Sequence, residues 1–301
     1  MALVLLALLV ACAPASVRRG RRAMARGDFE EGARFYREAA NAAPNDARAW
    51  IRLAKAELLA ERPARAREAF ERAAAIRPTD PRPVVEVGFT HEIEREYDDA
   101  LQSYERAIAR APDDAYPHRV MGTRLLRWGQ AEAAVAPLER AVALDPEHLE
   151  TWKALAIARH ESGDPEGAAD AYLSALERYP ESVELHLGLA ATQVNAHDFE
   201  AALETYEVVN RLRPRFAAAH VGRAILLHEL GRPEQAEAAF ERAIEVARDP
   251  RPYQRRLREY RALLAAEPGP MSPAPESESE SESESESESE SESESESESE
   301  S

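Results

Sequence analysis

Apolar residues recur along this chain in runs spaced three and four positions apart. Residues 47–80 hold two such runs with a short break between them. Because positions three and four apart lie on one face of a helix, each run predicts a helix with one buried face. The break predicts a turn, so the stretch forms a helix pair. The positions that carry the pattern are Trp50, Leu53, Ala54, Ala66, Phe70 and Ala73.

The pattern returns every 34 residues over most of the chain. One small residue recurs at Gly20, Ala54, Gly88, Gly122, Ala156, Ala190 and Ala224. A second recurs at Gly32, Ala66, Ala100, Ala134, Ala168, Ala202 and Ala236. A ring or leucine follows at Tyr36, Phe70, Tyr104, Leu138, Tyr172, Tyr206 and Phe240. Six copies end in proline, at Pro44, Pro78, Pro112, Pro146, Pro180 and Pro214.

The recurring residues explain how the two helices of a copy pack together and where each copy ends. Small residues at two fixed points allow paired helices to approach closely, with the ring packed beside them. Proline cannot continue a helix, so it turns the chain into the next copy. Glycines such as Gly129, Gly163 and Gly231 mark the turn inside a copy.

This combination resembles the tetratricopeptide repeat, with its W-x2-L-G-x2-Y, A-x3-F and P pattern. The resemblance implies an all-α fold, a right-handed α-solenoid of stacked helix-turn-helix repeats wound into a superhelix. The array is expected over residues 16–250, in one phase and without a single central core. Its seven repeats are 13–46, 47–80, 81–114, 115–148, 149–182, 183–216 and 217–250.

Histidine replaces the tryptophan of the family pattern in three repeats. Trp50 and Trp152 keep it, whereas His118, His186 and His220 stand at the same position elsewhere. Stacked repeats would separate these histidines by roughly 10 Å, too far to share a zinc ion with ligand bonds of about 2 Å. We therefore expect packing substitutes and no metal site.

Three segments follow the array. Residues 251–266 predict an amphipathic capping helix, since end repeats need a polar outer face. Residues 267–275 predict a linker, and the Ser-Glu repeat of 276–301 predicts a disordered acidic tail because it has no apolar residue to bury. Slippage of a repetitive coding stretch would also explain the tail. If it has a role, we expect loose binding to the arginines of the cap, Arg251, Arg255, Arg256, Arg258 and Arg261.

The N-terminus predicts a lipid anchor. The apolar run from Ala2 to Ala15 is too short to span a bilayer and reads as a signal peptide over residues 1–11. Leu9-Val10-Ala11-Cys12 resembles a bacterial lipobox, which implies a lipidated Cys12 and a tether over residues 12–15. No basic residue precedes the run and four arginines follow it, against the usual bias. The alternative is an apolar N-terminus without processing.

Composition and motifs argue against chemistry in this chain. The 301 residues carry a net charge of −18, but the tail holds 13 of the 56 acidic residues, which leaves 43 against 38 basic ones. That balance offers no footprint for nucleic acid. The single cysteine excludes an intrachain disulfide and a cysteine zinc site. No phosphate loop, nucleophile elbow or zinc-protease motif occurs, so we expect no enzyme, cofactor or small-molecule substrate.

The resemblance implies a concave groove that binds peptides and is lined by the first helix of each repeat. At the positions that line the groove in the family, this sequence has a basic set, which is Arg48, Arg52, Lys55, Arg119 and Lys153. At the same positions in later repeats it has an apolar set, which is Ile157, Leu187, Ala191, Val221 and Ile225. A partner segment with an acidic part and an apolar part would suit this groove. The alternative is that superhelical winding buries the apolar set.

The sequence therefore predicts a non-catalytic scaffold or adaptor that binds a protein segment. With the lipid at Cys12, it would act in a complex of the bacterial cell envelope. The alternative is a cytosolic adaptor, or a targeting subunit for a separate enzyme. The partner itself is not identified by these residues.

Overall fold

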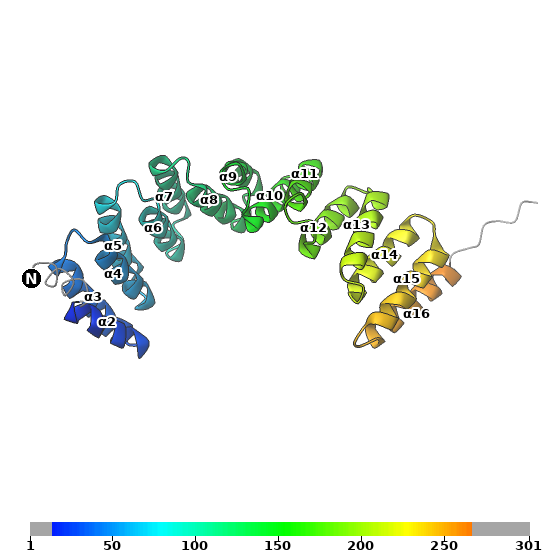
Figure 1. Cartoon of the computed structure of the whole chain (residues 1–301), viewed down its shortest axis with the longest axis horizontal. Helices are drawn as coiled ribbons and strands as arrows, with labels where there is room; N and C mark the ends of the chain where they lie inside the picture. The colour runs from blue at the N-terminus through cyan, green and yellow to red at the C-terminus, as the bar shows by residue number, and fades with distance from the viewer. Residues whose placement is uncertain (1–13, 267–301) are drawn as a thin grey trace, which may run out of the picture.

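The computed structural model describes residues 14–266, which form 15 α-helices and no strand. The helices come in seven antiparallel pairs followed by one last helix (Figure 1). The pairs are α2 (Ala15–Ala25) with α3 (Phe29–Ala42), α4 (Ala47–Leu59) with α5 (Pro63–Ile76), α6 (Arg82–Ile93) with α7 (Tyr97–Arg110), α8 (Ala115–Arg127) with α9 (Ala131–Leu144), α10 (Leu149–Glu161) with α11 (Pro165–Leu176), α12 (Val183–Asn195) with α13 (Phe199–Leu212), and α14 (Ala217–Glu229) with α15 (Pro233–Val246). The last helix is α16 (Arg251–Ala266).

Local sequence explains where helices begin. The Asp46 side chain accepts a hydrogen bond from the backbone N–H of Arg48 at 2.9 Å. The Asp164 side chain accepts one from the backbone N–H of Gly167 at 2.8 Å. Such caps satisfy N–H groups that have no partner within the helix. Proline occupies the first turn of α5, α11 and α15, where its missing N–H costs nothing.

Small residues and rings hold each pair together, as the sequence predicts. A Cβ placed on Gly88 of α6 would lie 2.4 Å from Cε1 of Tyr104 on α7. Gly20 and Gly122 meet Tyr36 and Leu138 in the same way. Tyr104 and Leu138 are fully buried, so the ring or leucine fills the space that the missing side chain leaves.

The pairs stack into an open arch (Figure 1). Each helix packs on the next along the chain, and the thinnest junction between pairs is that of α7 with α8. Buried residues form successive clusters along the arch and not one centre, with the largest running from Leu125 to Leu189. The predicted all-α helical solenoid is confirmed.

The tryptophan position has one structural role in five repeats. Trp50 and Trp152 donate from Nε1 to the carbonyls of Pro44 and Pro146, at 2.9 and 2.8 Å. The histidines at this position place Nε2 at hydrogen-bond distance from the proline six residues earlier. The pairs are His118 with Pro112 at 3.0 Å, His186 with Pro180 at 2.9 Å and His220 with Pro214 at 3.1 Å.

Several sequence predictions fall outside the described residues. These are the signal peptide, Cys12 and the first half of the predicted tether at the N-terminal end, and the linker and Ser-Glu tail beyond Ala266. Within residues 14–266, no helix is both long and apolar enough to cross a bilayer.

Candidate binding surface on the first helices

The first helices of successive pairs lie on the inner side of the arch. In the middle of the array α6, α8, α10 and α12 contact one another in turn, whereas their partners α7, α9 and α11 share no comparable contact. Helices that splay apart lie on the outside of a curve. Figure 1 shows α7, α9 and α11 along the outer edge. Side chains exposed on the first helices therefore face the inside of the arch.

Most of the predicted groove residues are accessible there. Arg48, Lys55 and Ala191 are exposed, and Ile157 and Ile225 keep 39% and 48% of their surface. Partly buried positions are Arg52, Arg119, Lys153 and Leu187. These residues come from five of the seven first helices.

Val221 does not belong to this surface. It is only 4% exposed and joins a buried cluster with Leu226, Leu257 and Tyr260. The start of α16 lies beside it, with Tyr253 and Val221 lining the same small cleft. The cap therefore covers a position that the repeat pattern alone leaves open.

Lys153 is not an available positive charge. Its Nζ lies 2.5 Å from Oε1 of Glu184 and 3.2 Å from the carboxylate of Glu150. Burial lowers the pKa of Lys153, but the hydrogen bonds that it donates to the two glutamates outweigh this effect and raise the pKa overall. Lys153 ties α10 to α12, so its charge is already engaged, and its binding to an acidic partner stays a prediction.

The basic part of the surface contains residues that the sequence reasoning missed. Glu86 of α6 interacts with Lys55, and the Tyr116 ring of α8 lies under Arg119 with the guanidinium 5.7 Å from its centroid. Burial raises the pKa of Tyr116, and the charge of Glu86 raises it further. Lys55, Glu86, Tyr116 and Arg119 therefore form one electrostatic group.

This part of the surface holds several cations without ion-pair partners. Arg124 pairs with Glu92 at 3.3 Å and its guanidinium lies 4.5 Å from the ring centroid of Phe89. The other basic residues of these helices have no ion pair within residues 14–266. They are Arg48, Arg52, Lys55, Arg82, Arg119 and Arg127. An acidic ligand would find five cations here with no acidic partner, together with Lys55, whose charge Glu86 partly offsets.

The basic and apolar regions are not as separate as predicted. Leu59 and Ile93 end α4 and α6 and are 53% and 59% exposed, in the half predicted to be basic. They are 34 residues apart and so occupy the same position in successive repeats, a position outside the predicted groove set. The surface therefore combines charged and exposed apolar side chains in repeats two and three as well.

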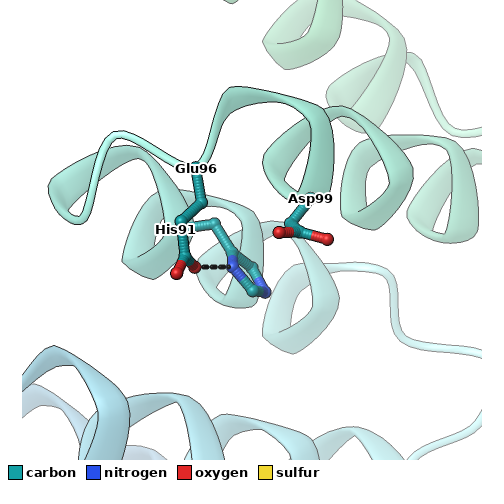
Figure 2. A group of neighbouring side chains, drawn as sticks. All are labelled: His91, Glu96 and Asp99. Carbon is teal, nitrogen blue, oxygen red and sulfur yellow. Dashed lines mark hydrogen bonds and ion pairs between the residues drawn. The ribbon is translucent and has the colours of Figure 1, made fainter.

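A polar cluster on the outer side has another explanation than metal binding. Figure 2 shows His91, Glu96 and Asp99 turned toward one another, with His91 Nδ1 2.7 Å from Oε2 of Glu96. The guanidinium of Arg67 lies 2.9 Å from the same Nδ1 and 3.1 Å from Glu96. Arg67 supplies the positive charge that a metal would bring. The cluster fastens the α6–α7 turn to α5.

This cluster lines a wide cleft of 1090 Å³ between α3, α5 and α7. Its wall mixes Arg65, Arg72 and Glu68 with the paired groups, so no single charge dominates. Hydrogen bonding by His91 and attraction by Arg67 lower the pKa of Glu96. No nucleophile with an adjacent base lies on this wall, and its chemistry is that of a structural ion-pair network.

Comparisons with known proteins agree with the repeat geometry. Two family models, both described as tetratricopeptide repeat, match the chain. One matches residues 17–81 and 119–183, and the other matches 159–214 and 195–266. A search of the curated proteins finds no match to this sequence.

Solved structures share the fold at low identity. The C-terminal part of a TPR repeat-containing protein from Cytophaga hutchinsonii is 14% identical over 81% of this chain and 98% of that one, with a TM-score of 0.64. A chain of the Naa15/Naa10 structure with HypK-THB is 18% identical over 82% of this chain and 38% of that one, with a TM-score of 0.53. MamA from Desulfovibrio magneticus is 22% identical over 56% of this chain and 96% of that one, with a TM-score of 0.47.

Proposed function

Because the chain belongs to the tetratricopeptide repeat family, we propose that it is a non-catalytic scaffold that binds a segment of a partner protein along the inner side of its arch. We further propose that it does so in a complex of the bacterial cell envelope. The first statement rests on the described surface, and the second rests on the N-terminal sequence around Cys12.

The observation that carries the proposal is the set of unpaired cations on α4, α6 and α8. Six basic side chains there have no ion pair within residues 14–266. Exposed Leu59, Ile93, Ile157 and Ile225 continue the same side of the array. A segment with acidic and bulky apolar residues would therefore neutralise charge and bury apolar area together.

A second candidate is a targeting subunit for a separate enzyme. The solved Naa15/Naa10 structure, which is itself a complex bound to HypK-THB, shares this fold over most of the present chain. In that case the partner would be a soluble enzyme and the chain would stay outside the membrane fraction. Replacement of Cys12 by serine separates the two candidates. The envelope proposal requires loss of palmitate labelling and release from the membrane fraction.

The proposed surface is tested by crosslinking and affinity capture. The variant Ile157→Asp/Ile225→Asp places charge on two exposed inner positions. Leu173→Asp is the matched control, since Leu173 is 50% exposed but lies on the second helix α11. A partner identified with the unaltered chain should be lost from the double variant and kept by the control.

The opposite results would assign the partner to another surface. If Leu173→Asp abolishes capture and Ile157→Asp/Ile225→Asp does not, the partner binds the outer helices. If a photo-crosslinker at Lys55 or Ile225 yields no adduct while one at Leu173 does, the inner surface is excluded as well.

A further inference from the structure

Two adjoining clefts lie where the cap meets the last repeat. One has a volume of 670 Å³ and is bounded by Arg215, Phe216, Arg248 and the first residues of α16. The other has a volume of 330 Å³ and includes Arg256. Both are lined by Ala218, Pro252 and Tyr253, so they form one continuous depression, which we term the cap cleft.

The cap cleft has an excess of positive charge. Arg215, Arg248 and Arg256 are exposed and have no ion pair within residues 14–266. Its two acidic residues are already held, because Glu245 pairs with Arg242 at 2.6 Å and Asp249 pairs with Arg251 at 2.8 Å. The three free guanidiniums are therefore not neutralised by the cleft itself.

The structure also revises which arginines could receive an acidic segment. Arg261 bonds to Glu237 and Glu241, and Arg251 bonds to Asp249. Arg255 lies 3.6 Å from Glu259. Three of the five cap arginines expected from the sequence to meet the tail are thus engaged. Of the other two, Arg256 lines the cap cleft and Arg258 does not, so the cap cleft offers Arg256 together with Arg215 and Arg248.

The chain carries one segment of complementary charge. Residues 276–301 contain 13 glutamates and no lysine or arginine. They belong to the 35 residues that follow Ala266 in the sequence. As a flexible coil, 35 residues span roughly 30–35 Å. The α16 helix, with 16 residues, is about 24 Å long, so the cap cleft at its start is within reach.

We propose that the Ser-Glu segment of the same chain binds in the cap cleft and covers Arg215, Arg248 and Arg256. Individual exposed ion pairs are weak. Attachment to the same chain compensates, since a short linker gives an effective concentration of about millimolar. The nearest unpaired cations of the inner surface, Arg119 and Arg127 of α8, lie roughly four repeats away at about 10 Å each, so the cap cleft is filled first.

The consequence is a self-covered end of the array. An acidic ligand that approaches α14 and α16 must displace the segment, whereas one that binds α4 to α8 need not. Because salt screens the attraction between exposed charges, this association should weaken as ionic strength rises.

The test is fluorescence anisotropy with a labelled peptide of residues 276–301 at low salt. The peptide should bind the chain truncated after Pro275, and bind the full chain several-fold more weakly because the attached segment competes. Arg215→Glu/Arg248→Glu/Arg256→Glu in the truncated chain should weaken binding on the order of tenfold. All three side chains are exposed and unpaired, so the fold should remain, which circular dichroism checks.

The matched control reverses three cations of the inner surface, Arg48→Glu/Arg52→Glu/Arg119→Glu. Because the inner surface also attracts acidic peptides, this variant should weaken peptide binding to the full and truncated chains alike and leave the difference between them unchanged. If this control abolishes the difference between the full and truncated chains and the cap-cleft variant does not, the attached segment binds the inner surface and the proposal is wrong. Equal binding by the full and truncated chains would also refute it, since the attached segment would then leave the cleft open.

Discussion

At the scale of single residues, histidine can serve as tryptophan does in this repeat because one contact defines the position. Both rings present an N–H to the carbonyl of the proline that ends the previous repeat. His118 and His220 are only 8% and 7% exposed, so the bond lies in a largely dry environment. A buried carbonyl without a partner is costly, which favours a polar ring at this position in five repeats, although the third repeat places the buried Val84 there.

This role makes a prediction for His118. Replacement by phenylalanine keeps a ring but removes the donor to Pro112, so stability should fall by about 1 kcal/mol. Replacement by tryptophan restores an Nε1–H and should recover most of the loss. The measurement is the free energy of unfolding in urea. Equal stability of the phenylalanine variant would show that packing alone holds the position.

A second residue-scale prediction concerns Glu86. Burial raises its pKa, although Lys55 opposes the shift. An acid with a raised pKa in the folded state favours folding when protonated, and this contribution is lost as the pH rises through the folded pKa. Glu86→Gln should therefore be more stable than the unaltered chain at neutral pH, with the difference shrinking toward pH 4.5 and below. A constant difference across this range would contradict the burial effect.

The repeat pattern predicts the exposure of a first-helix residue when its position within the repeat decides that exposure. It fails where side chains of other helices cover the residue or pair with it. Arg48 and Ile157 are accessible because their repeat position faces away from the partner helix. Val221 is buried because α16 lies beside it, and Lys153 is neutralised by Glu184 on the next first helix. Both outcomes depend on residues about one repeat away in space, which periodicity cannot assign.

At the scale of elements, the turn inside each pair requires a left-handed residue. Glycine fills it at Gly27, Gly129, Gly163 and Gly231, with φ between 67° and 88°. The other three repeats place Glu61, Arg95 and His197 there, at φ of 57°, 62° and 59°. A side chain in this region costs about 1–2 kcal/mol. The helix pairs are therefore formed in these repeats against a local preference, through the burial of their apolar faces.

Glu61 is the site at which to test this strain, because its side chain has no ion pair or hydrogen bond within residues 14–266. Glu61→Gly should raise the free energy of unfolding by up to about 1 kcal/mol, since the relief exceeds the entropy that glycine adds to the unfolded chain. Glu61→Ala is the control that removes the side chain and keeps the strain. If alanine stabilises as much as glycine, the benefit does not come from the backbone.

At the scale of the whole molecule, stability is distributed along the arch. The cluster around Tyr36 and Phe70, the one around Tyr104, and the one that ends at Tyr260 are separate groups of buried residues. The 34-residue period was enough to predict this solenoid, because each repeat must bury its face on the next. It could not predict that the junction of α7 with α8 is the thinnest, since that depends on how far successive pairs rotate.

A core substitution should therefore act locally. Ala134 is fully buried on α9, and its carbonyl would lie 3.2 Å from a Cβ placed on Gly122. Ala134→Leu forces a large side chain into this contact and should cost about 1–3 kcal/mol. Because each pair touches only its neighbours, we expect hydrogen exchange to speed up from α8 to α12, the range of the cluster that contains Ala134. The thin junction before α8 should leave α3 to α5 protected, and α14 to α16 should serve as the distant control. Equal loss of protection at both ends of the arch would mean that the array unfolds as one cooperative unit.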